Sequence, residues 1–148
     1  MELRGQHSSV ELVCEEVLPQ HLPSAGDVRL AVRVASHGFC GEYNQVWVAA
    51  DEFGRFLAAL RQLEATRLGA AEMAALSPDE FRLAVRTVDR SRHLVVEGRL
   101  GRLVHARHWH AVEFAFEFDS SLFGGAVREF ERLAQGTPNQ ALHLTGGA

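Results

Sequence analysis

The sequence predicts an α+β fold: a single, mainly antiparallel six-stranded sheet with two amphipathic helices packed on one face. Two patterns lead to this prediction. Six segments alternate apolar and polar residues with a period of two, as half-buried strands do, and two others space their apolar residues three or four apart, as amphipathic helices do. The elements follow in the order β-β-β-α-β-β-β-α, and their short connections favour antiparallel neighbours.

The clearest signal lies between His108 and Leu133. Residues 109–118 alternate over ten positions, and three phenylalanines share one side of this strand. The segment 119–121 (Asp-Ser-Ser) then supplies candidate N-cap side chains, so a helix is expected to follow. The apolar stripe of this helix consists of Phe123, Val127, Phe130 and Leu133. A strand with a phenylalanine face needs an apolar partner, which this helix offers.

Five other segments are predicted as strands from the same alternation: 10–15, 28–34, 39–48, 81–86 and 94–100. In the segment 39–48 both faces are mixed, so the pattern does not decide which face points inward. Residues 89–92 form a predicted tight turn between two strands of a hairpin. Residues 70–76 are predicted as a short helical turn.

The first helix is predicted to begin with Asp51 as its cap. Its apolar stripe consists of Phe53, Phe56, Leu57, Leu60 and Leu63. With the two helices on one face of the sheet, the other face would be charged. It would carry Arg29, Arg33, Arg82, Arg86, Glu97, Arg99, Glu113 and Glu117. Opposite charges on neighbouring strands of such a solvated ladder stabilise a sheet by ~0.2 to 1 kcal/mol per pair.

Length and composition indicate one globular domain, expected at residues 1–135, followed by a disordered tail at 136–148. Hydrophobic residues make up 47% of the chain and charged residues 23%, and no apolar run approaches the ~18 residues of a membrane helix. The start of the chain lacks the apolar core of a secretory signal. We therefore expect a cytoplasmic protein in which Cys14 and Cys40 are reduced.

The charge composition bears on possible partners. All 15 basic residues are arginine, which favours planar, bidentate pairs with surface carboxylates. The net charge of −4 argues against nucleic acid or an anionic membrane as a main partner and is compatible with a basic one.

His105, His108 and His110 are the one cluster of potential metal ligands in the sequence. Residues two apart on a strand point the same way, so His108 and His110 could share a zinc ion that His105 approaches from the loop. Solvated or structural histidines are the alternative, and no Asp or Glu stands at a sequence spacing that suggests a further metal ligand. We therefore predict no metal, no cofactor and no catalytic residue, with these histidines as the candidate ligands if a metal does bind.

Several motifs occur together along the chain. They are Gly38-Phe39-x-Gly41-x-Tyr43, the helix at 53–64, Leu76-Ser77-Pro78, Phe81-x-Leu83, the hairpin at 89–94, and Phe114-x-Phe116-x-Phe118-Asp119 before a helix. With these motifs the chain resembles the WapI-type immunity family over roughly residues 28–133. The resemblance implies a small cytoplasmic protein that binds a cognate polymorphic toxin domain and blocks it stoichiometrically, without a cofactor and without catalysis. Family members often carry a longer polar motif after the Asp that ends the last strand, and residues 120–125 stand in its place here.

Five residues are predicted to contact the toxin from the open sheet face: Glu42, Glu97, Trp109, Glu113 and Glu117. Acidic side chains there would speed the capture of a nuclease toxin with a basic cleft. Two other functions are open at this point. The chain could be a metal-dependent or small-ligand-binding enzyme built around the three histidines, or a non-catalytic homo-oligomeric scaffold. We expect a monomer or a homodimer, with no nucleic acid and no membrane among its partners.

Overall fold

The computed structural model describes residues 1–5, 7–88, 93–105 and 107–135. The predicted turn at 89–92 and the predicted disordered tail at 136–148 lie outside the described residues. In chain order the elements are β1 (Glu2–Arg4), β2 (Ser8–Val17), β3 (Val28–Ser36), β4 (Phe39–Val48), α1 (Ala50–Thr66), β5 (Ala70–Ala74), β6 (Phe81–Thr87), β7 (Leu94–Val104), β8 (His108–Phe118), a 3-10 turn η1 (Ser120–Leu122) and α2 (Phe123–Ala134). All six predicted strands and both predicted helices are therefore confirmed.

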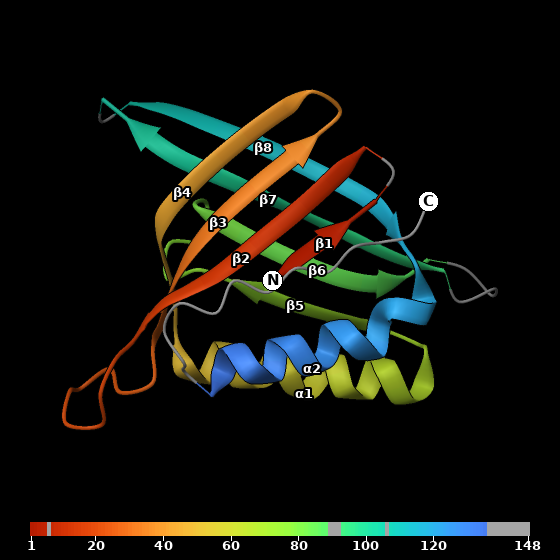
Figure 1. The fold of residues 1–148 in the computed structure, drawn as a ribbon. Helices are drawn as coiled ribbons and strands as arrows, with labels where there is room; N and C mark the ends of the chain where they lie inside the picture. Colours follow the sequence, from red (N-terminus) through yellow and green to blue (C-terminus); the bar gives the residue numbers. More distant parts are fainter. Residues whose placement is uncertain (6, 89–92, 106, 136–148) are drawn as a thin grey trace.

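The strands form two antiparallel sheets, β1-β2-β3-β4 and β5-β6-β7-β8, in which consecutive strands pair. The α+β class with antiparallel pairing is confirmed, but the prediction of one six-stranded sheet is wrong. Helix α1 separates the two runs of strands, and β5 pairs with β6 alone. The sheets pack face to face with their strands in crossed directions (Figure 1). Each apolar sheet face is thus covered mainly by the other sheet.

The two halves of the chain have the same element order: a four-stranded meander followed by a helix. Their contacts correspond as well, because β3 lies against β8 and β4 lies against β7, while the two helices touch each other. If β1–β4 are exchanged in order with β5–β8, the contact of β3 with β8 becomes the contact of β7 with β4. Residues 1–66 and 70–134 therefore share an element order and two corresponding contacts between the sheets.

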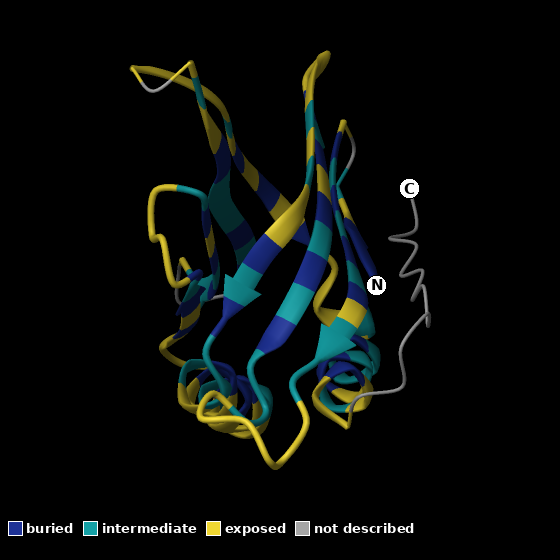
Figure 2. Cartoon of the chain, turned by 90° about the vertical axis from the view of Figure 1, so that its left-hand side faces the viewer, coloured by how far each residue is buried: buried dark blue, intermediate teal, exposed yellow. Residues whose placement is uncertain are grey.

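The helices do not lie on one face of a single sheet as predicted. They lie side by side along one edge of the sandwich, next to β5 (Figure 1), and in the turned view they sit below both sheets (Figure 2). Both predicted apolar stripes are buried there. Because two sheets face each other, the helices fill the end of the space between them and share one core with both.

The two helix starts differ from each other. Asp119 accepts a hydrogen bond from the backbone N–H of Ser121 at 2.8 Å, so the predicted cap before the second helix is confirmed, with η1 as its first turn. Asp51 is not the cap of α1. The helix begins at Ala50, whose backbone N–H donates to the Asp27 carboxylate at 2.9 Å. The cap thus comes from the loop before β3, which a local sequence pattern does not show.

The segment 70–76, predicted as a helical turn, contains strand β5. Its alanines have high helix propensity, but Ala71 and Met73 are buried while Ala70 and Glu72 are exposed, which is the alternation of a strand. Pairing with β6 therefore overrides local propensity. Strand β1 was not predicted, because three residues are too short for a period to be visible.

An irregularity in β4 explains why its two faces look mixed. Val32 stands opposite Tyr43 and Leu30 opposite Val46, so β4 has one extra residue between these pairs. The bulge shifts the phase of the strand. Gly41 and Tyr43 therefore point to the same side as Val46 and Val48, although odd and even positions would point to opposite sides in a regular strand.

The core is continuous through both sheets and both helices. At its centre between the helices, the rings of Phe56 and Phe130 meet edge to face with centroids 5.0 Å apart. Both side chains are almost fully buried. Such an aromatic pair adds about 0.5 to 1.5 kcal/mol to the stabilisation from burial alone.

Replacing Phe130 by Ala is expected to lower the free energy of unfolding by about 3 to 5 kcal/mol, because it leaves a cavity between the helices. Urea denaturation followed by circular dichroism measures this. The matched control is Phe39→Ala, because Phe39 is 73% exposed and its loss is expected to change stability by less than about 0.5 kcal/mol. Equal effects of the two variants would contradict the core described here.

Gly98 and Gly54 form a second matched pair. A Cβ on Gly98 in β7 would overlap the carbonyl oxygen of Arg82 and lie 2.7 Å from the Phe114 ring, whereas one on Gly54 in α1 would meet nothing within 4 Å. We expect Gly98→Ala to destabilise by about 1 to 3 kcal/mol. Gly54→Ala is expected to stabilise by about 0.5 to 1 kcal/mol, because alanine favours the helix. Thermal unfolding of the two variants tests both signs.

Candidate functional site

The structure places four of the five predicted partner-binding residues on one surface. Glu97, Trp109, Glu113 and Glu117 share the outer face of the β5–β8 sheet, as their strand register and alternation show. Glu42 stands opposite Arg33 on the outer face of the other sheet. Glu42 therefore belongs to the outer face of the other sheet, although it also borders the cleft described below, together with Trp109.

The five predicted residues include four glutamates, Glu42, Glu97, Glu113 and Glu117. Three of these glutamates form an ion pair with an arginine on the neighbouring strand. Glu97 and Arg86 make a bidentate pair with N···O distances of 2.7 and 3.0 Å. Glu113 lies 3.3 Å from Arg99, and Glu42 lies 3.1 Å from Arg33. The expected arginine–carboxylate ladder is therefore confirmed on both outer faces. The fourth, Glu117, makes no ion pair with any residue that the structure describes.

The hydrogen bonds from Arg86 lower the pKa of the Glu97 carboxyl below its usual value of 4.5. A lowered folded-state pKa means that this pair stabilises the protein above about pH 4.5 and that the contribution is lost as the pH falls through the lower, folded value.

Glu97→Gln should therefore reduce the free energy of unfolding at neutral pH by about 0.2 to 1 kcal/mol, the range for exposed pairs. The difference from the parent protein should shrink as the pH is lowered below 4.5. Denaturation series at pH 7 and at about pH 3 measure this. Glu117→Gln on the same face is the control, and a pH-independent loss in Glu97→Gln would argue against the ion pair.

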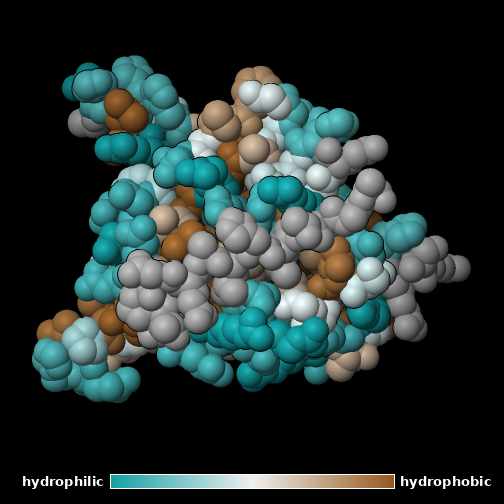
Figure 3. Space-filling view, viewed as in Figure 1, coloured by the Kyte–Doolittle hydropathy of each residue, from teal (hydrophilic) through white to brown (hydrophobic). Residues whose placement is uncertain are grey.

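A cleft opens at the end of the sandwich opposite the helices. There the β3–β4 and β7–β8 hairpins diverge, as the turned view shows (Figure 2). The cleft has a volume of about 660 Å³, and it lies between residues 39–43 on one side and residues 100–102, 104 and 109–112 on the other. Figure 3 shows the hollow at the upper left, with apolar surface on both hairpin tips.

The walls of the cleft combine aromatic and cationic groups. At its base β4 comes close to the other sheet, because Gly41 has no side chain and faces Val112 and Leu100. Further out, the Arg102 guanidinium lies over the Tyr43 ring, 5.5 Å from the ring centroid. Phe39 stands at the rim and is largely exposed. Sequence analysis named Glu42, Trp109 and His110 as candidates but did not predict that they line one cleft, because they become neighbours only when the two hairpins cross.

The outer side of the β7–β8 hairpin is apolar at its tip. Leu103 and Trp109 stand directly opposite each other and are 45% and 42% exposed. Alternation places this pair on the same face as Glu113 and Glu117. Tryptophan is enriched at protein interfaces, whose rims are polar, so this surface is the candidate protein-binding patch.

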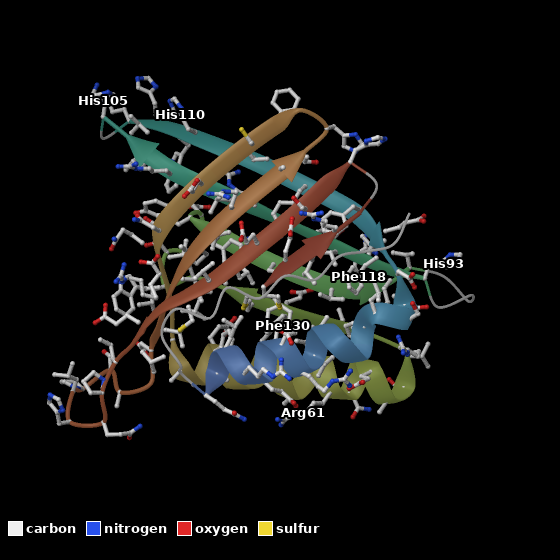
Figure 4. The ribbon with its side chains drawn as sticks, in the orientation of Figure 1. Arg61, His93, His105, His110, Phe118 and Phe130 are labelled. Carbon is white, nitrogen blue, oxygen red and sulfur yellow. The ribbon has the colours of Figure 1, made fainter. Side chains whose placement is uncertain are left out.

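The three predicted metal ligands are exposed near the same hairpin tip, where Figure 4 shows His105 and His110. His108 and His110 share a face of β8, as predicted, and His105 lies in the turn with a φ of 53°. Among the described residues, however, no group of three His, Cys, Asp or Glu side chains is placed to hold a metal ion. The cluster on which the enzyme alternative depends is therefore not formed.

A second group of histidines comes together at another place. His7, His37 and His93, which are far apart in sequence, line a hollow of about 500 Å³ beside Glu117 and Asp119. The rings of His7 and His37 are 5.9 Å apart, and the His37 backbone N–H donates to the His7 carbonyl. Figure 4 shows His93 far from His105 and His110, so the two histidine groups are separate.

Comparisons with known proteins leave the family open: no family model, no curated protein and no solved structure matches this chain. The resemblance to the immunity family therefore rests on the motifs quoted from the sequence. Among the described helices, none is both long and apolar enough to cross a membrane.

Proposed function

We propose that this protein is a non-catalytic binding protein that captures a protein partner with its β7–β8 hairpin, and that the partner is a polymorphic toxin domain. One observation carries the proposal: Leu103 and Trp109 are presented together to solvent on a hairpin whose other end is anchored in the core. Tryptophan is one of the residues most enriched among the few contacts that dominate the binding energy of a protein interface.

The surroundings of this pair support the same function. Glu113 and Glu117 lie on the same face of β8 and provide a charged rim next to the apolar pair. The base of the hairpin is held by buried residues such as Leu94, Val96 and Phe114, so the exposed tip is supported by a fixed scaffold. A preorganised surface loses less conformational entropy when it binds.

The toxin as partner is supported by the sequence resemblance, which implies stoichiometric neutralisation without catalysis. The protein that the adjacent upstream gene encodes is the partner to test. Its C-terminal domain should arrest bacterial growth when expressed alone, and co-expression of this chain should restore growth. The two purified proteins should form a one-to-one complex in sedimentation analysis. A toxic domain that this chain neither binds nor neutralises would overturn the proposal.

The double variant Leu103→Ala/Trp109→Ala tests which surface binds. We expect it to weaken the complex by about thirtyfold or more, because a central aromatic anchor contributes at least about 2 kcal/mol. Binding is measured by titration calorimetry and protection by growth. The matched control is Leu68→Ala/Leu76→Ala, which removes two leucines that are 63% and 61% exposed on other loops. Equal effects of the two double variants would exclude the hairpin as the binding surface.

A further inference from the structure

We infer that the cleft between β4 and the β7–β8 hairpin binds an extended segment of the protein partner that carries carboxylate side chains. The inference rests on the proposed function, because it assigns a second contact to the same hairpin. The apolar pair lies on the outer face of the hairpin, while the cleft, whose lining also includes Trp109, opens on its inner side. A partner could therefore hold the hairpin from both sides.

Arg102 is the first reason. Most arginines that the structure describes pair with a carboxylate, among them Arg33, Arg86 and Arg99. Arg102 pairs with none of the described carboxylates, and its guanidinium lies instead over the Tyr43 ring inside the cleft. A guanidinium held over a ring keeps N–H groups available, and arginine binds a carboxylate through such a planar set of donors.

The local charge is the second reason. The segment from Arg102 to His110 contains two arginines and three histidines and no Asp or Glu, although the whole chain has a net charge of −4. His110 stands opposite Arg102 and shares its face of the hairpin. The β7–β8 wall of the cleft thus carries Arg102 and His110 and no acidic residue, while Glu42 on the β4 wall is paired with Arg33. An acidic segment is complementary to the β7–β8 wall.

The free edge of β4 is the third reason, and it favours a protein segment over a small anion. β4 is the last strand of its sheet, so half of its backbone N–H and C=O groups point away from β3. The part of β4 that lines the cleft runs from Phe39 to Tyr43 and ends at the bulge. An extended segment can add to this edge as a fifth strand and place alternate side chains against Arg102 and Tyr43.

The experiment uses the full chain and an acetylated, dye-labelled peptide of alternating glutamate and valine, about eight residues long, which forms an extended acidic strand. Fluorescence anisotropy should show saturable binding. Amide NMR spectra should change at residues 39–43 and at 100–104. In Arg102→Glu the affinity should fall by about tenfold or more, because attraction becomes repulsion. Arg102→Lys should be intermediate, because the charge remains without the planar, bidentate guanidinium.

Arg128→Glu is the matched control, since Arg128 is an exposed arginine on α2 and undergoes the same change of charge. It should keep the parent affinity, and thermal unfolding should show that both variants are folded. The inference is overturned if the peptide does not bind, if a lysine–valine peptide binds equally well, or if Arg102→Glu binds the peptide as tightly as the parent and the Arg128→Glu control do. Equal displacement of the peptide by free glutamate would identify a small-anion site and would also overturn it.

The two proposals fail in different ways. The peptide titration needs no toxin, so its failure removes the cleft as a docking site and leaves capture by Leu103 and Trp109 intact. Failure of the parent protein to neutralise its toxic neighbour removes the proposed function, whatever the peptide does.

Discussion

Two apolar sheet faces that cover each other are the constraint on which the rest of this structure depends. Leu12 and Val32 from one sheet and Val96 and Phe116 from the other are nearly inaccessible to solvent. Isolated sheets of this size would leave one such face in water. The helices add their stripes to the same core, with Phe56 against Phe130. Each layer therefore depends on the others for the burial of its apolar face.

The same packing explains why one end of the molecule is open. Sheets whose strands cross stay in contact near the crossing and separate toward the hairpin tips. Along the inner side of the β7–β8 hairpin, the pair Leu100 and Val112 still belongs to the closed part, whereas the next pair is Arg102 and His110. The change from apolar to basic side chains coincides with the point where the hairpin leaves the core. The cleft is therefore a consequence of where the contact between the sheets ends.

The distribution of charge also has two parts. On the outer sheet faces, arginine and glutamate alternate across strands and largely neutralise each other. Such exposed pairs contribute little to stability individually, and they leave a mixed surface suited to the rim of an interface. At the hairpin tip the basic residues have no acidic neighbours in sequence. Net charge alone pointed to a basic partner, but the local arrangement at the cleft favours an acidic segment.

The sequence by itself determined the elements with a clear period. The strand at 109–118 and the helical stripe ending at Leu133 appear in the structure as predicted, although the burial of the strand alternates only over 112–118 and residues 109–111 are all exposed. Such patterns reflect which side of one element is buried. Elements that depend on a distant partner were missed or misassigned. Strand β5 follows from pairing with β6, and α1 is capped by Asp27 from another loop.

Only the tertiary structure decided how the elements combine. The alternation of a strand indicates that one face is covered, but not whether a helix or a second sheet covers it. The pattern is therefore equally compatible with one sheet under helices and with the two sheets that the structure has. The outer face with Glu97, Glu113 and Glu117 could be derived from alternation alone, whereas its separation from Glu42 could not. The contact of Tyr43 with Arg102 joins residues far apart in the chain, and it exists because two hairpins cross.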